Sequence, residues 1–190
     1  MNKAPFLTAT MLAVAILSFP AHAQDAQKQM AIKAADSPSQ AVLESWNDIA
    51  RKLIAMAEDF PEDKYDFKPT PAQRSFAQQL LHAAGASYFF VNPVMNEKML
   101  TEEDPKREQY KTKADVVAFM KKAFADGAAA IQAKGDKGMS DLVVDPFARQ
   151  QVRISDLAYG FIEHSGEHYG QLVVYYRLSG LVPPESRPKK

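Results

Sequence analysis

The chain has 190 residues, the length of one domain, and its 46% hydrophobic and 24% charged residues exclude an intrinsically disordered protein. Its 23 basic residues balance 23 acidic ones, so we expect no nucleic-acid partner, because such proteins carry a clustered positive excess. It contains no cysteine, which excludes disulfides, thiolate metal ligands and a cysteine nucleophile.

The first 23 residues have the pattern of a secretory signal peptide. Lys3 gives a positive start, an apolar run of 13 residues follows, and Ala-His-Ala at 21–23 matches the small-x-small pattern of a cleavage site. The apolar run is shorter than the roughly 20 residues that span a bilayer, although an uncleaved anchor is the alternative. We therefore predict cleavage after Ala23, a periplasmic or secreted protein, and no stable membrane span afterwards.

A polar segment then precedes the first helix. Residues 24–37 are rich in alanine, glutamine and lysine, and we expect a flexible leader ahead of one domain over 38–190. Apolar residues at three-and-four spacing after Ser39 predict a helix. This helix is expected to end at Phe60, because a residue before proline, here Pro61, is disfavoured in the helical region.

The second helix is predicted from a capping box. Ser75 can cap the helix while Gln78, three residues later, reaches back to the cap residue. We expect this helix to run to about Val91, since Asn92-Pro93 follows.

The third and fourth helices follow two polar connections. Thr112 with Asp115 repeats the capping box and begins the third helix, which is expected to end near Ala133. The fourth is predicted over about 154–178, where Gly180 and later prolines stop it.

These segments predict an all-α fold. No segment alternates with period two between turn signals, so we expect no strand, and the glycine- and lysine-rich stretch 134–145 is interpreted as a loop. Four amphipathic helices with polar connections predict a four-helix bundle. The long connection between helices 2 and 3, roughly 96–111, would allow those two helices to run parallel.

The histidines are the strongest candidates for a site. Of the four in the chain, His22 leaves with the signal peptide. His164 and His168 are four apart on one helix face, the spacing at which the HExxH helix chelates zinc. His82 lies within the second helix, and helix bundles place ligands on facing helices. Three histidines with an open fourth position would make a catalytic metal centre. The alternatives are a surface or capping pair and a core histidine that bonds a carbonyl.

Four further residues are weaker candidates. Gln171 could orient a metal-bound water, and Tyr175 could line the same pocket. Glu163 and Glu167 could accept hydrogen bonds from the imidazoles, although neighbouring charges are more often a solvated face. We predict catalytic candidates Gln171, Tyr175 and Glu167 beside a metal site of three histidines.

The motifs on the second and last helices resemble a known family. They are a histidine on the second helix, an HxxxH pair followed by Gly-Gln on the last, and a Gly…Pro-Pro exit: His82, His164 with His168, Gly170-Gln171, Gly180, and Pro183-Pro184. Together they resemble the DinB-like superfamily, also called the DinB/YfiT group, over about residues 40–186.

This resemblance implies a four-helix bundle in up-down-down-up order, and a zinc or nickel ion held by His82, His164 and His168. It also implies a homodimer. Characterised relatives include thiol S-transferases and a mycothiol-dependent maleylpyruvate isomerase. Small thiols are cytoplasmic reagents, so the predicted export favours hydrolysis of a small-molecule substrate instead.

Two other interpretations stay open. His164-x-x-Glu167-His168 also matches the inverted zincin motif H-x-x-E-H, in which the glutamate is the general base. Such peptidases need a further acidic ligand well downstream, and only 22 residues follow His168. The second alternative is a non-catalytic metal-binding or interaction bundle. The leading hypothesis is an exported metal-dependent hydrolase or thiol S-transferase.

Overall fold

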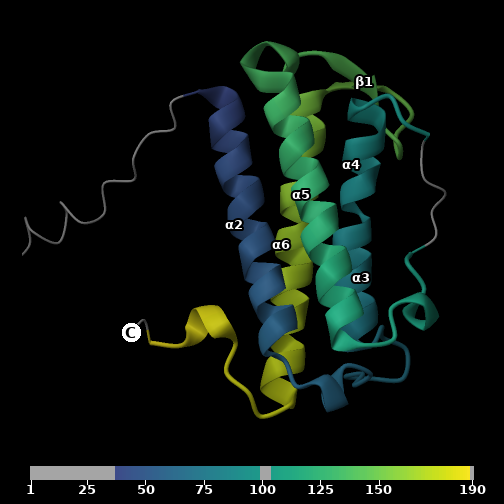
Figure 1. Ribbon diagram of the computed structural model, residues 1–190, viewed down its shortest axis with the longest axis vertical. Coiled ribbons are helices and arrows are strands. Elements are labelled where there is room, and N and C mark those ends of the chain that lie inside the picture. The colour runs from purple at the N-terminus through teal and green to yellow at the C-terminus, as the bar shows by residue number, and fades with distance from the viewer. Residues whose placement is uncertain (1–36, 99–103, 189–190) are drawn as a thin grey trace, which may run out of the picture. The chain divides into compact units, whose positions relative to one another are not determined.

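The computed structural model describes residues 37–98 and 104–188, and over these ranges the protein is mostly helical with one small sheet (Figure 1). The predicted all-α class is confirmed in this coarse form. The predicted signal peptide and nearly all of the predicted leader lie outside the described residues, so both stay predictions. No helix in the described ranges is long and apolar enough to cross a membrane.

The first described helix, α2, spans Pro38–Asp59. It begins just before Ser39, because the hydroxyl of Ser37 accepts a hydrogen bond from the backbone N–H of Gln40 at 3.2 Å and Pro38 occupies the first turn. The helix ends as predicted, with Phe60 in an extended conformation.

The predicted second helix is divided into α3, Phe76–Gly85, and α4, Ser87–Val94. The capping box of Ser75 and Gln78 is confirmed. The predicted end before Asn92-Pro93 is wrong. Proline lacks only its own N–H, so in the last turn it removes a single hydrogen bond, and the N–H of Met95 still bonds the carbonyl of Val91 at 2.9 Å.

The third predicted helix is α5, Lys113–Gly138, which runs past the predicted end near residue 133. Thr112 and Asp115 form the expected capping box. Gly135 interrupts the helix with a φ of 56°, a conformation that glycine adopts without steric strain. The turn after Gly135 is helical again, which the glycine- and lysine-rich sequence did not indicate.

The prediction that the chain has no strand is wrong. Strands β1, Leu142–Val144, and β2, Gln151–Arg153, pair antiparallel with Val143 opposite Val152. Each strand has three residues, too few for a period-two pattern to stand out. Asp145 stabilises the connecting loop, since its Oδ1 accepts from the backbone N–H of Phe147 at 2.7 Å and of Ala148 at 2.9 Å.

The last helix, α6, spans Ile154–Leu178 and matches its predicted range. Gly180, two residues after the end of α6, has a φ of 75°, so the chain leaves the helix there. Three single-turn 3₁₀ helices lie in the connections and the C-terminal segment: η1 Glu62–Lys64, η2 Arg107–Gln109 and η3 Pro184–Ser186.

Contacts at both ends of α2 fix the direction of α5. The Nζ of Lys113, at the start of α5, donates to the carbonyl of Phe60 at 2.9 Å. At the other end, the hydroxyl of Ser39 donates to Asp136 at 2.6 Å. The two helices are therefore antiparallel, and Figure 1 shows α3 beginning at the same end as α5.

The core between these helices is largely aromatic. The indole of Trp46 is fully buried, donates from Nε1 to the carbonyl of Phe124 at 2.9 Å and lies 4.2 Å from the ring of Phe161. Where α3 begins and α6 ends, four buried rings pack together. We call them the aromatic cluster: Phe60, Tyr65, Phe76 and Tyr176.

Candidate metal centre

The three histidines converge between α3 and α6. His82 comes from α3, and His164 and His168 come from successive turns of α6. One nitrogen from each ring lies within 4.8 Å of the other two, and the Nε2 atoms of His164 and His168 are 2.9 Å apart. The ring of His82 lies 4.6 Å from that of His168 and 5.3 Å from that of His164. Ring nitrogens from two helices therefore face one point.

Asp104 orients the ring of His82. The Nδ1 of His82 donates to Oδ1 of Asp104 at 2.6 Å, which leaves Nε2 to face the other imidazoles. Arg74 holds the same carboxylate through its second oxygen, at 3.0 Å. Burial would raise the pKa of Asp104, but its bond to His82 and the charges of His82 and Arg74 hold that pKa below its ordinary value. Asp104 is therefore an ionised acceptor at neutral pH.

Two glutamines hold the ring of His168. The Oε1 of Gln171 lies 3.0 Å from Nδ1 of His168 and accepts from it when that nitrogen is protonated. The amide nitrogen of Gln79 lies 2.5 Å from the same Nδ1, but as a donor it bonds Oε1 of Gln171, at 2.5 Å, when Nδ1 is protonated. With Nδ1 protonated and held by Gln171, Nε2 of His168 is the nitrogen that can bind an ion.

His164 has the least satisfied ring. Its Nδ1 is buried with no hydrogen-bond partner among the described residues, and so is the hydroxyl oxygen of the neighbouring Ser165. Burial, with the nearby His168 and His82, lowers the pKa of His164 to about 4. Burial also lowers the pKa of His168. Both imidazoles are thus neutral at pH 7, the form that binds a metal ion.

The residues present fit a divalent metal ion. Nitrogens that share a tetrahedral zinc at about 2.0–2.1 Å lie about 3.3 Å from one another. The Nε2 atoms of His164 and His168, 2.9 Å apart, are slightly closer than this, and the limit of 4.8 Å for all three nitrogens is longer. Side-chain rotations that move the nitrogens by about an ångström would bring the three to the spacing of a zinc site. The described residues contribute no carboxylate to the group.

The other predicted site residues divide into two groups. Gln171 contacts His168, and Tyr175 lies one turn beyond, where its hydroxyl donates to the carbonyl of Arg74 at 2.7 Å. Both line a hollow of about 480 Å³. Glu163 and Glu167 are exposed on α6, and neither bonds an imidazole within the described ranges.

Asp104 was missed by the sequence analysis. It lies before α5, 22 residues from His82, within the long connection of roughly 96–111, in which no site residue was predicted. Nothing in the spacing links the two residues. Gly85 makes the approach possible, because a Cβ there would lie 2.8 Å from the ring of Pro105, next to Asp104.

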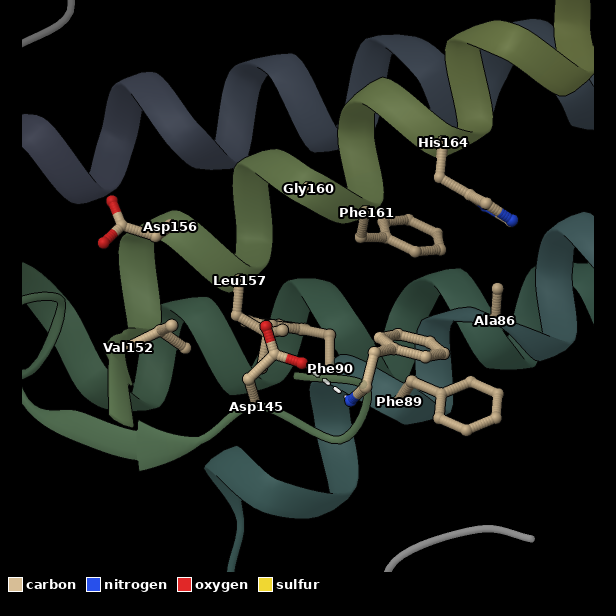
Figure 2. Close-up of a pocket in the computed structure, with 11 residues that line it drawn as sticks. Ala86, Phe89, Phe90, Asp145, Val152, Asp156, Leu157, Gly160, Phe161 and His164 are labelled. Atoms are coloured by element: carbon tan, nitrogen blue, oxygen red, sulfur yellow. Dashed lines mark hydrogen bonds between the residues drawn. The ribbon is translucent and has the colours of Figure 1, made fainter. Parts of the chain in front are cut away.

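An apolar cavity of about 250 Å³ opens beside His164. Figure 2 shows Leu157, Phe161 and His164 extending from α6 on the side where Ala86 and Phe89 lie. The histidine group therefore borders an apolar cavity at His164, and Gln171, which contacts His168, lines a separate hollow.

Comparisons with known proteins agree on one family. The family model described as the DinB superfamily matches residues 46–172. A DinB-like protein from Bacillus cereus has a similar structure, with a TM-score of 0.64 and 16% identity over 80% of this chain and 98% of that one. A DinB-like protein from Bacillus subtilis has a TM-score of 0.59 and 18% identity over 78% of this chain and 99% of that one. These two likenesses show the fold, and no curated protein matches the chain.

Proposed function

This chain belongs to the DinB superfamily, and we propose that it is a metal-dependent hydrolase that binds one divalent ion through His82, His164 and His168. The observation that carries the proposal is the convergence of three imidazoles from two helices on one point. Zinc and nickel are the proposed ions, because neutral imidazole suits both and the donor set lacks thiolates.

An ion held by three histidines, with its fourth coordination position open, would lower the pKa of a bound water to about 7, and this is the chemistry that it would supply. The protein's own groups prepare for it. Asp104 accepts the Nδ1–H of His82, and Gln171 accepts that of His168, so the opposite nitrogens stay deprotonated and oriented. Gln171 also lines the separate hollow, where it can hold a substrate or water hydrogen.

Two observations support a catalytic site over a structural one. A structural zinc site is closed by four protein ligands, whereas the described residues offer three. The group also borders two spaces that a small molecule could enter, one at His164 and one at His82. The sequence prediction of export, with the cytoplasmic location of small thiols, favours hydrolysis over thiol transfer.

We include the up-down-down-up order in the proposal. The antiparallel contacts of α2 with α5 support it, since α3 and α5 then start at the same end (Figure 1). Cleavage after Ala23, a periplasmic or secreted location and a homodimer stay predictions.

Metal content tests the ligand set. Purified protein loaded with zinc or nickel and then desalted should retain about one ion per chain by mass spectrometry. His82→Ala, His164→Ala and His168→Ala should each lose it, because a three-ligand site has no spare ligand. Glu163→Ala, a change on the exposed face of α6, is the matched control and should keep the ion. Stoichiometric metal in the His82 variant would contradict the site.

Activity then separates a hydrolase from a non-catalytic bundle. Zinc- and nickel-loaded protein should hydrolyse members of a panel of uncharged aryl esters, and chelated protein and His82→Ala should not. Transfer of glutathione to an electrophile is the second arm of the screen. Full metal occupancy without turnover in either arm would favour the binding bundle.

A further inference from the structure

The apolar cavity has a wall built mostly of aromatic rings. Its lining includes Phe89 and Phe90 of α4, Phe161 of α6 and Phe147 of the hairpin loop. Phe147 is 67% exposed, and its ring lies 5.0 Å from that of Phe89. The hairpin therefore adds an aromatic outer wall to a space formed by α4 and α6.

The charges at the cavity are carboxylates that already have partners. Asp145 accepts two backbone N–H groups of its own loop, and Asp156 pairs with Arg153 at 2.8 Å. The residues described as lining the cavity include no lysine or arginine. An anionic group would meet two carboxylates there, and the cation at Asp156, Arg153, is already paired with that carboxylate, so the cavity favours an uncharged occupant.

The size of the cavity fits one substituted ring. An apolar cavity of about 150 Å³ in another protein holds benzene, and this one measures about 250 Å³. Lining residues on α6 run from Asp156 to His164 (Figure 2). At about 1.5 Å per residue the eight steps between them cover about 12 Å, the length of a ring with a short substituent.

The cavity ends at a proposed metal ligand. Leu157, Gly160, Phe161 and His164 follow three-and-four spacing, so they share one face of α6. If the aromatic ring of a ligand lay between Leu157 and Phe89, its substituent would extend toward His164. The part of the substrate that reacts would then lie at the histidine group.

We propose that this cavity binds the uncharged aromatic group of the substrate, and that Gly160 and Phe147 set the size of the group accepted. This inference rests on the proposed function for the reaction, but binding of the ring itself needs no ion. The hairpin then has a role in recognition.

Ring binding can be measured on metal-free full-length mature protein by ¹⁹F NMR. 4-Fluorobenzyl alcohol should bind with a Kd of about 1 mM or lower, and 4-fluorobenzoate, its anionic counterpart, at least about tenfold more weakly. Chelator is present throughout, so the carboxylate cannot gain from a metal ion. Equal or tighter binding of the benzoate would overturn the proposal.

Two glycines of α6 provide a matched pair of variants. A Cβ at Gly160 or at Gly170 would meet nothing within 4 Å, but only Gly160 lines the cavity. Gly160→Leu should weaken binding of 4-fluorobenzyl alcohol at least about tenfold, and Gly170→Leu should leave it unchanged. Circular dichroism checks that both variants are folded. Equal binding by the two variants would rule out the cavity as the ring site.

A third probe links the ring site to the ion. 4-Fluorobenzyl mercaptan, whose thiolate can bind zinc, should bind more tightly to zinc-loaded than to metal-free protein, and Gly160→Leu should reduce that gain. Ring binding without any metal uptake would refute the proposed function and leave the ring site standing. Metal uptake with no ring binding would refute the ring site and leave the proposed metal site standing.

Discussion

Helices α3 and α6 contribute to two side-chain clusters, the buried aromatic cluster and the partly buried histidine group, which satisfy their polar atoms differently. In the aromatic cluster, the hydroxyl of Tyr65 donates to the carbonyl of Ala57 at 2.5 Å and that of Tyr176 to Met56 at 2.8 Å. In the histidine group, one turn or more away on the same helices, Nδ1 of His164 has no partner within the described ranges. One cluster is complete as it stands, and the other has a buried polar atom left over.

The difference separates a region that stabilises the fold from one that can bind. A buried polar atom without a partner costs about 1–3 kcal/mol, so a group that keeps one lowers the free energy of unfolding. Burial raises the pKa of Tyr65 and of Tyr176, which keeps both hydroxyls as neutral donors. Burial lowers the pKa of His164, which keeps a lone pair free for an ion. The same physical cause serves packing in one cluster and ligation in the other.

The largest expected effect lies in the aromatic cluster. Phe76 is fully buried, stacks on Phe60 at 3.8 Å and contacts Tyr65 and Tyr176. Phe76→Ala should lower the free energy of unfolding by about 3–5 kcal/mol, measured by urea denaturation. Phe147→Ala, at a 67% exposed ring, is the control and should change it by no more than about 0.5 kcal/mol. A loss under about 1 kcal/mol for Phe76→Ala would refute the contrast.

The next effect is on metal affinity at Asp104. Asp104→Asn keeps the shape but removes the charge that orients His82, so zinc affinity should fall about 10–100-fold. Asp66→Asn is the matched control, since Asp66 is an exposed carboxylate paired with Arg107 at 2.9 Å and, within the described residues, bonds no imidazole. Competition with a zinc-binding dye measures both variants. Equal affinities would mean that Asp104 does not orient a ligand.

The contrast also explains what could be predicted from the sequence. The starts of the predicted helices and both capping boxes follow from local spacing, whereas two helix ends did not. The family motifs named His82, His164 and His168 because each lies in a helix that the sequence pattern predicts. Asp104 and the short hairpin depend on contacts between distant segments, through the close approach at Gly85 and the pairing of Val143 with Val152. Spacing along the chain carries no signal for such contacts.

The pH dependence of zinc binding should reflect the lowered pKa values. An unperturbed imidazole titrates near pH 6.5, as a rough reference, whereas the pKa of His164 is about 4 and that of His168 is also lowered. Protons therefore compete with zinc at these two ligands only at lower pH. NMR titration of the two rings in metal-free protein measures this, and metal content after dialysis over the same range shows where zinc is released. Protonation of His164 at about pH 6.5 would contradict the burial of its ring.

The same shifts give a sign for stability without metal. An imidazole in the unfolded chain has a pKa of about 6.5. Below that pH the unfolded chain binds protons at these two histidines that the folded chain does not bind. The free energy of unfolding of chelated protein should therefore fall as the pH drops from about 6.5 through about 4. Urea midpoints measured with chelator across this range check the direction. A rise in stability toward pH 4 would contradict it.

The smallest expected effect is the stability of His164→Leu without metal. Leucine has a similar size, removes the buried Nδ1 that lacks a partner, and also removes the 2.9 Å contact with His168. The gain from the first change and the loss from the second are each about 1 kcal/mol and opposite in sign. In chelator, the free energy of unfolding of the variant should therefore stay within about 1 kcal/mol of that of the unsubstituted protein. Added zinc should stabilise only the unsubstituted protein, because an ion that binds the folded state stabilises it by mass action. Urea denaturation with and without zinc measures both. A loss as large as that of Phe76→Ala in chelator would mean that the histidine group stabilises the fold as the aromatic cluster does, and the comparison between the two clusters would be wrong.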